Sequence, residues 1–185
     1  METWLVACLG NPGKDYQGHR HSVGFVVGEE LARRQGLGKP RAKYRGALWT
    51  CSYHGKEVLV LLPQTYMNLS GRSVVEAAGG HRIPIKHILA VHDDVELPFG
   101  EVRLKEGGGL GGHNGLRSME QSLGSREFFR VRVGVGRPDN PRIDLADYVL
   151  SRFSEPAHEV RAMVARAADL VEEWLAEHAE ITCPD

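Results

Sequence analysis

Residues Thr3–Gln35 read TWLVACLGNPGKDYQGHRHSVGFVVGEELARRQ, and they carry the clearest signal of the fold class. Residues 3–9 form an apolar run that a Gly-Asn-Pro-Gly turn ends, which is typical of a buried strand. Over about 22–35 the apolar residues recur at helical spacing, with Ser22 as a candidate N-cap and Gly36 as a stop signal. A buried strand followed by an amphipathic helix predicts an α/β unit.

The rest of the chain continues to interleave strands and helices. Strands are predicted over 46–53, 57–62, 87–92, 101–105 and 128–136, and the His54-Gly55 pair predicts a hairpin between the first two. Helices are predicted over 70–79, 114–123, 142–150 and 155–178. We therefore expect an α/β fold with one domain over residues 1–185, in which a twisted mixed β-sheet is sandwiched between helices in three layers.

Composition limits the class of protein. The 185 residues are 42% hydrophobic and 25% charged, which is typical of a soluble globular chain. No apolar run reaches the roughly 18 residues of a membrane span, and the N-terminus lacks a basic signal region. The three cysteines, Cys8, Cys51 and Cys183, are far apart and indicate reduced thiols rather than disulfides or a zinc site. We expect a cytoplasmic protein, and a monomer as the default.

The net charge of −1 gives no global signal for a polyanion-binding protein. Basic residues are nevertheless concentrated between Lys14 and Arg45 and between Arg103 and Arg142. A near-neutral protein with such basic segments can still bind a polyanion on one face.

Several familiar chemistries are disfavoured. The glycines of 107–112, GGGLGG, match a dinucleotide fingerprint, but the required acid about 20 residues further on is absent, and Arg130 and Arg132 occupy that neighbourhood. No Walker A motif and no G-x-S-x-G elbow occurs. A metal site is a stronger alternative, because His92-Asp93-Asp94, His21 and His113 offer ligands for Zn or Mn, although no H-E-x-x-H motif is present.

A metal-free hydrolytic site fits the strand-end loops best. An aspartate beside a histidine can orient the ring and stabilise the imidazolium, so that the histidine takes a proton from water; His21 and Asp93 are the candidates. Attack on an ester also needs hydrogen-bond donors where the oxyanion forms. The loop amides of Asn11, Asn68 and Asn114 can supply them.

Four motifs, LGNPGKDYQGHRHSVGF, PQTYMNLSG, VHDDVELPFG and KEGGGLGGHNGLRS, resemble those of bacterial-type peptidyl-tRNA hydrolase in order and spacing. The resemblance runs from Leu9 to about Pro138, and the helical tail matches in character only. Members of this family share the α/β fold expected here. They cleave the ester between a peptide and the 3′ ribose of tRNA, and so recycle peptidyl-tRNA released from ribosomes. No cofactor or metal is implied, and the partner is the acceptor end and phosphate backbone of tRNA.

The resemblance also implies roles for individual residues. His21 would be the general base, Asp93 its orienting partner, and Asn11 the residue that reads the blocked amino group of the substrate. The implied substrate and tRNA contacts are Tyr16, Tyr66, Met67, Asn68, His113, Asn114, Lys105 and Arg132. Stacking of aromatic residues and phosphate contacts from basic residues suit a single-stranded acceptor end.

The sequence departs from the family pattern at four positions. Ser22 replaces an Asn, Leu110 a His, Glu96 an Asp and Tyr66 a Phe. We expect Ser22 mainly to cap its helix. The neighbouring acid Asp94 leaves two candidates for the partner of His21, of which the family pattern selects Asp93.

Other polar residues have simpler interpretations. His19 is expected to be a loop residue and His92 a structural histidine at a strand end. Arg20, Arg130 and Lys14 are as readily solvated as tRNA-facing. Two alternative functions stay open: an RNA-binding module without turnover, as in plastid splicing-factor relatives of the family, and a metal-dependent hydrolase.

Overall fold

A seven-stranded sheet forms the centre of the structure, a computed structural model that describes the backbone of residues 1–180 and the side chains of residues 1–177. The strands are β1 Thr3–Cys8, β2 Arg41–Lys43, β3 Gly46–Tyr53, β4 Lys56–Pro63, β5 Ile88–Asp94, β6 Val102–Glu106 and β7 Phe129–Gly134. Their order is β2-β3-β4-β1-β5-β7-β6. The central strands β4, β1, β5 and β7 are parallel, and the outer strands pair antiparallel, so the sheet is mixed as predicted.

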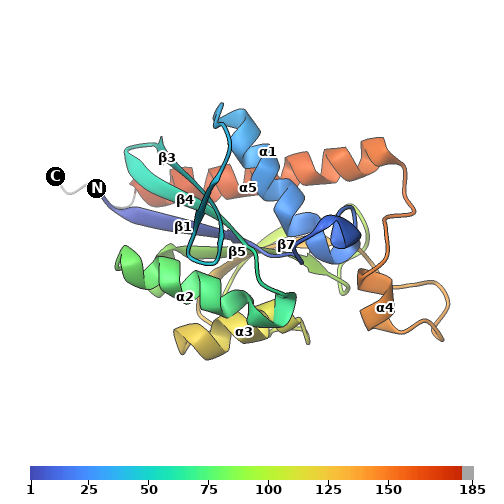
Figure 1. Cartoon of the computed structure of the whole chain (residues 1–185). Helices are drawn as coiled ribbons and strands as arrows, with labels where there is room; N and C mark the ends of the chain where they lie inside the picture. The colour runs from blue at the N-terminus through green and yellow to red at the C-terminus, as the bar shows by residue number, and fades with distance from the viewer. Residues whose placement is uncertain (181–185) are drawn as a thin grey trace.

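Helices cover both faces of this sheet (Figure 1). Helices α1 (Val23–Arg34) and α5 (Ala157–Glu180) pack together on one face, and α2 (Ser70–Gly80) and α3 (Asn114–Leu123) on the other. The short helix α4 (Leu145–Val149) lies beyond one end of the sheet, apart from these layers. The three-layer α/β/α arrangement predicted from the sequence is confirmed.

The first strand shows why its sequence is apolar throughout. Trp4, Val6 and Cys8 pack in the core under α1 and α5, whereas Leu5 and Ala7 pack in the core under α2 and α3. Successive side chains of a strand point to opposite faces, so a strand covered on both faces needs a continuous apolar run. The thiols of Cys8 and Cys51 are free, while Cys183 lies outside the described residues.

Local turns explain where the predicted elements hold and where they fail. His54 and Gly55 have φ angles of 49° and 75°, which is the left-handed pair that a two-residue hairpin requires, so the predicted hairpin is confirmed.

The prediction of a helix over 142–150 is wrong at its start. The Asp144 side chain accepts a hydrogen bond from the backbone N–H of Ala146 and thereby begins α4 only at Leu145. Strand β2 was not predicted, because three exposed residues carry no periodic signal.

Loops of the candidate site follow the carboxyl ends of the parallel strands β1 and β4, whereas the glycine-rich loop before α3 follows the antiparallel strand β6. The short 3-10 helices η1 (Lys14–Tyr16) and η2 (Arg20–Ser22) lie between β1 and α1, and η3 (Met67–Leu69) precedes α2; the remaining one is η4 (Ile85–His87). Gly24 lets α1 approach the strands closely, because a Cβ there would overlap the carbonyl oxygens of Leu9 and Val91. This approach brings η2 to the end of β5.

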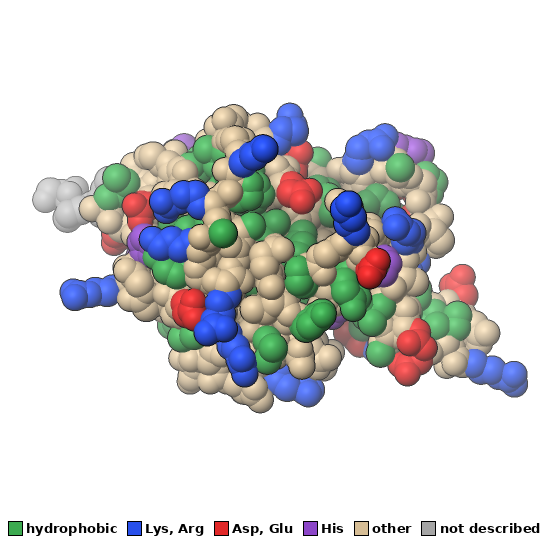
Figure 2. Space-filling view, viewed as in Figure 1, with side chains coloured by type: hydrophobic (Ala, Val, Ile, Leu, Met, Phe, Trp, Pro, Cys, Tyr) green, Lys and Arg blue, Asp and Glu red, His purple; other side chains and the backbone are tan. Residues whose placement is uncertain are grey.

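Among the described residues, none of the helices combines the length and the apolar character needed to cross a membrane. Lys and Arg side chains are spread over much of the face shown in Figure 2, and they are not gathered into a single patch.

Candidate active site

His21 and Asp93 are in direct contact. His21 lies in η2 after β1, and Asp93 lies near the end of β5, so residues 72 positions apart meet at one edge of the sheet. The Nδ1 atom of His21 is 3.0 Å from Oδ1 and 2.9 Å from Oδ2 of Asp93. Both side chains are almost entirely buried.

His113 holds the same carboxylate from another direction. Its Nε2 lies 2.9 Å from Oδ1 of Asp93, and its ring centroid is 4.9 Å from that of His21. His113 is also the N-cap of α3: its Nδ1 accepts hydrogen bonds from the backbone N–H groups of Gly115 and Leu116, at 3.1 and 3.3 Å. The helix start therefore fixes the ring that orients Asp93.

These partners determine which nitrogen of each ring carries the proton when the ring is neutral. Backbone N–H groups can only donate, so Nδ1 of His113 must be the unprotonated nitrogen, and the ring donates from Nε2 to Asp93. The remaining carboxylate oxygen accepts from Nδ1–H of His21. A neutral His21 then carries its lone pair on Nε2, the nitrogen a general base would use.

The charges around Asp93 favour its ionised form. Burial alone would raise the pKa of this carboxyl, but the two imidazoles outweigh burial and lower the pKa well below its ordinary value. An ionised Asp93 stabilises positive charge on a ring that takes up a proton.

His92 behaves differently from the other two histidines. Burial and the neighbouring His113 lower its pKa to about 4, against the opposing effects of Asp93 and Asp94. Its Nδ1–H donates to the backbone carbonyl of Asp93 at 2.8 Å, which supports the strand end. The expectation of a structural strand-end histidine agrees with this position, and the neutral ring adds no charge to the site.

Asp94 is committed to another partner. Its Oδ2 accepts a hydrogen bond from Nε of Arg132 at 2.7 Å, and its Oδ1 accepts one from the backbone N–H of Glu96. Burial acts to raise the pKa of Asp94, but the bond from Arg132 lowers it overall. Only Asp93 of the two acids contacts His21.

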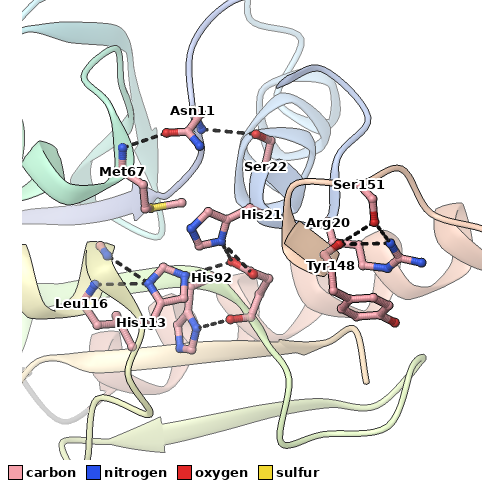
Figure 3. Close-up of polar contacts among 12 residues, drawn as sticks. Asn11, Arg20, His21, Ser22, Met67, His92, His113, Leu116, Tyr148 and Ser151 are labelled. Atoms are coloured by element: carbon pink, nitrogen blue, oxygen red, sulfur yellow. Dashed lines mark hydrogen bonds and ion pairs between the residues drawn. The ribbon is translucent and has the colours of Figure 1, made fainter. Parts of the chain in front are cut away.

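Asn11 is held by the loop that precedes α2. Its side-chain Oδ1 accepts a hydrogen bond from the backbone N–H of Met67 at 2.7 Å, which leaves its Nδ2 hydrogens as the side chain's donors (Figure 3). The backbone N–H of Asn11 donates to Oγ of Ser22 at 3.2 Å. Ser22 occupies the N-cap position of α1 as predicted, but its hydroxyl makes no capping hydrogen bond and instead accepts the one from Asn11.

A cavity of about 390 Å³ lies beside this network. Six of the predicted site residues line it: His21, Asp93, Lys105, His113, Asn114 and Arg132. Its wall also includes Leu110 and the α4 residues Leu145, Ala146 and Val149. No motif or periodicity in the sequence points to the three α4 residues.

The other predicted residues do not line this cavity. Asn11 lines a second hollow of about 580 Å³, between the loop that contains it and strand β2. Met67 is buried, Asn68 is exposed, and Tyr66 is 61% exposed. Tyr16 packs edge-on against His19, with the ring centroids 5.9 Å apart.

Known proteins resemble this chain over nearly its whole length. The model of the Peptidyl-tRNA hydrolase family matches residues 5–183. The chain belongs to the peptidyl-tRNA hydrolase family. It is 51% identical over 154 residues to the peptidyl-tRNA hydrolase of Geobacter metallireducens, which covers 83% of this chain and 78% of that protein. It is 44% identical over 173 residues to that of Geotalea daltonii, covering 93% and 90%.

Solved structures of the peptidyl-tRNA hydrolase family share this fold. The crystal structure of a peptidyl-tRNA hydrolase in complex with N-propanol superimposes with a TM-score of 0.85 at 35% identity, covering 96% of this chain and 91% of that one. The Acinetobacter baumannii peptidyl-tRNA hydrolase gives a TM-score of 0.82 at 34% identity, covering 96% and 92%.

Two arginines of this family member are placed where the sequence did not lead us to expect them. The sequence allows Arg20 and Arg130 to be solvated or tRNA-facing, but they are only 4% and 1% exposed. Arg130 donates to the backbone carbonyls of Gly108 and Gly109, and so holds the glycine-rich loop that lines the cavity. Nothing in the sequence distinguishes either arginine from an exposed one. Their burial and their partners become visible only in the folded structure.

Among the residues the structure describes, one group could hold a metal ion: His21, Asp93 and His113. One ligand atom from each lies within 4.8 Å of the others. In this structure each histidine uses one ring nitrogen to hydrogen-bond the carboxylate of Asp93. A metal ion bound by all three residues would replace those two hydrogen bonds.

Proposed function

We propose that this protein hydrolyses the ester bond between a peptide and the 3′ ribose of tRNA, with His21 as the general base. The contact between Nδ1 of His21 and the buried carboxylate of Asp93 carries this proposal. It directs the free lone pair of the ring to Nε2 and supplies a fixed negative charge for the protonated state. Membership of the family supports the choice of substrate.

In the proposed reaction, Nε2 of His21 removes a proton from water, and the water oxygen attacks the carbonyl carbon of the ester. The resulting oxyanion is stabilised by amide donors, for which Asn114 and Asn68 are the candidates. Collapse of this intermediate breaks the bond to the 3′ oxygen, which takes the proton from His21. The products are a peptide with a free carboxylate and a tRNA with a 3′ hydroxyl.

Asn11 is proposed to select blocked substrates. Its oxygen is occupied by Met67, so it presents N–H donors. A donor can bind the carbonyl of an acylated amino group, whereas the free ammonium group of an aminoacyl-tRNA offers no acceptor.

Lys105 and Arg132 are proposed to bind tRNA phosphates, and Tyr16 and Tyr66 to pack against the 3′ end or the peptide.

The direct test is hydrolysis of N-acetyl-aminoacyl-tRNA in the presence of EDTA, with free aminoacyl-tRNA as the comparison. We expect cleavage of the blocked substrate only, and a loss of about 10²–10⁴-fold in kcat for His21→Ala. His19→Ala is the matched control, since it removes a histidine from the same loop that does not contact Asp93, and it should stay within a few-fold of wild type.

Other outcomes would favour the alternatives. Near-full activity of His21→Ala would refute the proposed base. Loss of activity in EDTA with rescue by Zn or Mn would favour a metal held by the His21–Asp93–His113 group. RNA binding without turnover would indicate a binding module.

We further propose that residues 1–185 act as one domain and as a monomer in the cytoplasm. Light scattering on a sizing column should give one species near 20.5 kDa, and a doubled mass would contradict the monomer.

A further inference from the structure

Arg20 joins the loop that carries His21 to the segment that carries α4. It precedes His21 in η2 and is 4% exposed. Its backbone N–H donates to the carbonyl of Ser151 at 3.0 Å, and His19 forms a β-bridge with Arg152. Residues 19–20 and 151–152 are thus paired along the backbone.

The guanidinium adds a second set of contacts to the same segment. Its Nη1 donates to the backbone carbonyl of Tyr148 at 3.2 Å and to Oγ of Ser151 at 2.5 Å (Figure 3). Its Nη2 donates to Oγ of Ser154 at 3.4 Å and is 3.9 Å from a carboxylate oxygen of Glu155. The guanidinium carbon lies 3.9 Å from the centre of the Tyr148 ring, which is close enough for a cation–π interaction.

The segment held by Arg20 has little else to hold it. Helix α4 has five residues, none of which is buried. A helix this short is not stable on its own, and it has no apolar face in the core to compensate. Tyr148 supplies one further anchor, since its hydroxyl donates to the carbonyl of Val135 at 2.9 Å.

The same short helix forms one wall of the site cavity through Leu145, Ala146 and Val149. The position of this wall therefore depends on contacts made at its carboxyl end. Arg20 makes most of the side-chain contacts there, and its burial leaves its charge facing protein groups and not a phosphate in solvent.

We propose that Arg20 is a positioning residue that holds α4 against the substrate cavity. By fixing the position of α4, Arg20 affects how tightly substrate binds in the cavity. It does not affect proton transfer by His21. The loop of His21 keeps its own support when the guanidinium is removed, because the Arg20 N–H to Ser151 carbonyl bond and the His21 to Asp93 contact do not involve it. This proposal rests on the proposed function, in that the cavity is taken as the substrate site.

The test uses Arg20→Lys, which keeps the charge but cannot reach several acceptors at once. We expect KM for N-acetyl-aminoacyl-tRNA to rise about tenfold while kcat stays within about threefold of wild type. Amide hydrogen exchange of residues 145–151 should accelerate, while exchange of β1 stays unchanged. Arg34→Lys is the matched control, because Arg34 ties α1 to α5 through Asp169 and Glu172, and its further partner Glu30 lies in α1 itself. None of these residues lines the cavity. Arg34→Lys should lower Tm and leave KM unchanged.

Two results would overturn the proposal. In the first, Arg20→Lys changes neither KM nor the hydrogen exchange of residues 145–151. In the second, kcat falls while KM is unchanged, which would mean that Arg20 acts on His21. If Arg20→Lys does not fold, the double variant Ser151→Ala, Ser154→Ala removes two acceptors from the other side and is judged by the same two readouts. The exchange experiment needs no substrate. A failed role for His21 would therefore appear in His21→Ala, separately from a failed role for Arg20.

Discussion

Asp93 and Asp94 are neighbours in the chain but hold different partners: Asp93 binds the rings of His21 and His113, and Asp94 binds the guanidinium of Arg132. The first acid therefore belongs to a histidine network that can move a proton. The second belongs to a cation that faces the cavity. Substitutions at these adjacent positions should have distinct effects on the reaction.

Asp93→Asn should reduce kcat by about 10²–10⁴-fold. His113 donates to one side-chain atom, so the amide keeps its oxygen there and turns its N–H₂ toward His21. His21 then accepts on Nδ1, carries its proton on Nε2, and can no longer act as a base. Asp94→Asn is the control, and its kcat should remain within about threefold of wild type. Steady-state kinetics of both variants on one blocked substrate test this, and equal losses of kcat would contradict it.

His113 should show two separable roles, as a helix cap and as a support for Asp93. Asparagine is a good N-cap, so His113→Asn should keep the stability of α3, whereas His113→Ala should lose about 1 kcal/mol of unfolding free energy. Both variants lose the bond to Asp93, and kcat should fall about tenfold in each. Urea unfolding and kinetics measure the two effects independently, and full activity in His113→Asn would remove His113 from the site.

Lys105 and Arg132 should affect binding more than chemistry. Lys105→Ala and Arg132→Ala are expected to raise KM more than they lower kcat, and each should reduce the slope of log affinity against log salt by roughly 0.7–0.9. Arg33→Gln is the control, since Arg33 is an exposed arginine paired with Glu30 on α1. Unchanged KM with lower kcat in the two cavity variants would exclude them as phosphate contacts.

His92 should make the protein less stable in mild acid. Its pKa is lowered to about 4 in the folded state, while the unfolded chain has the ordinary value of about 6.5. Between these values the unfolded state binds the extra proton, so stability falls as the pH falls, by about 2 kcal/mol between pH 7 and pH 5. The lowered pKa of Asp93 has its effect only below about pH 4.

His92→Gln removes this titration. The difference in unfolding free energy between pH 7 and pH 5, measured in urea, should shrink by the same amount, whatever the variant does to stability at pH 7. A difference equal to that of wild type would show that His92 titrates normally in the folded protein.

Much of the fold could be predicted because the relevant signals are local. The apolar run over 3–9, the hairpin at His54-Gly55 and the helix over 114–123 each follow from side-chain periodicity or turn chemistry within a few residues. The start of α4 could not be placed, since a single cap at Asp144 decided it. Strand β2 exists only through its pairing with β3, which leaves no mark on three residues of sequence.

The α/β class, the family motifs and the set of polar residues near the strand ends can all be read from the sequence, because periodicity and motif spacing are properties of the chain. Which of those residues meet depends on the folded structure. It brought Asp93 rather than Asp94 to His21, turned the hydroxyl of the N-cap residue Ser22 to the backbone of Asn11 instead of to its own helix, and buried Arg20 and Arg130. The reason is that a side chain's partners depend on the register and packing of elements far apart in sequence, and a charge on its own does not say whether it faces water or a backbone carbonyl.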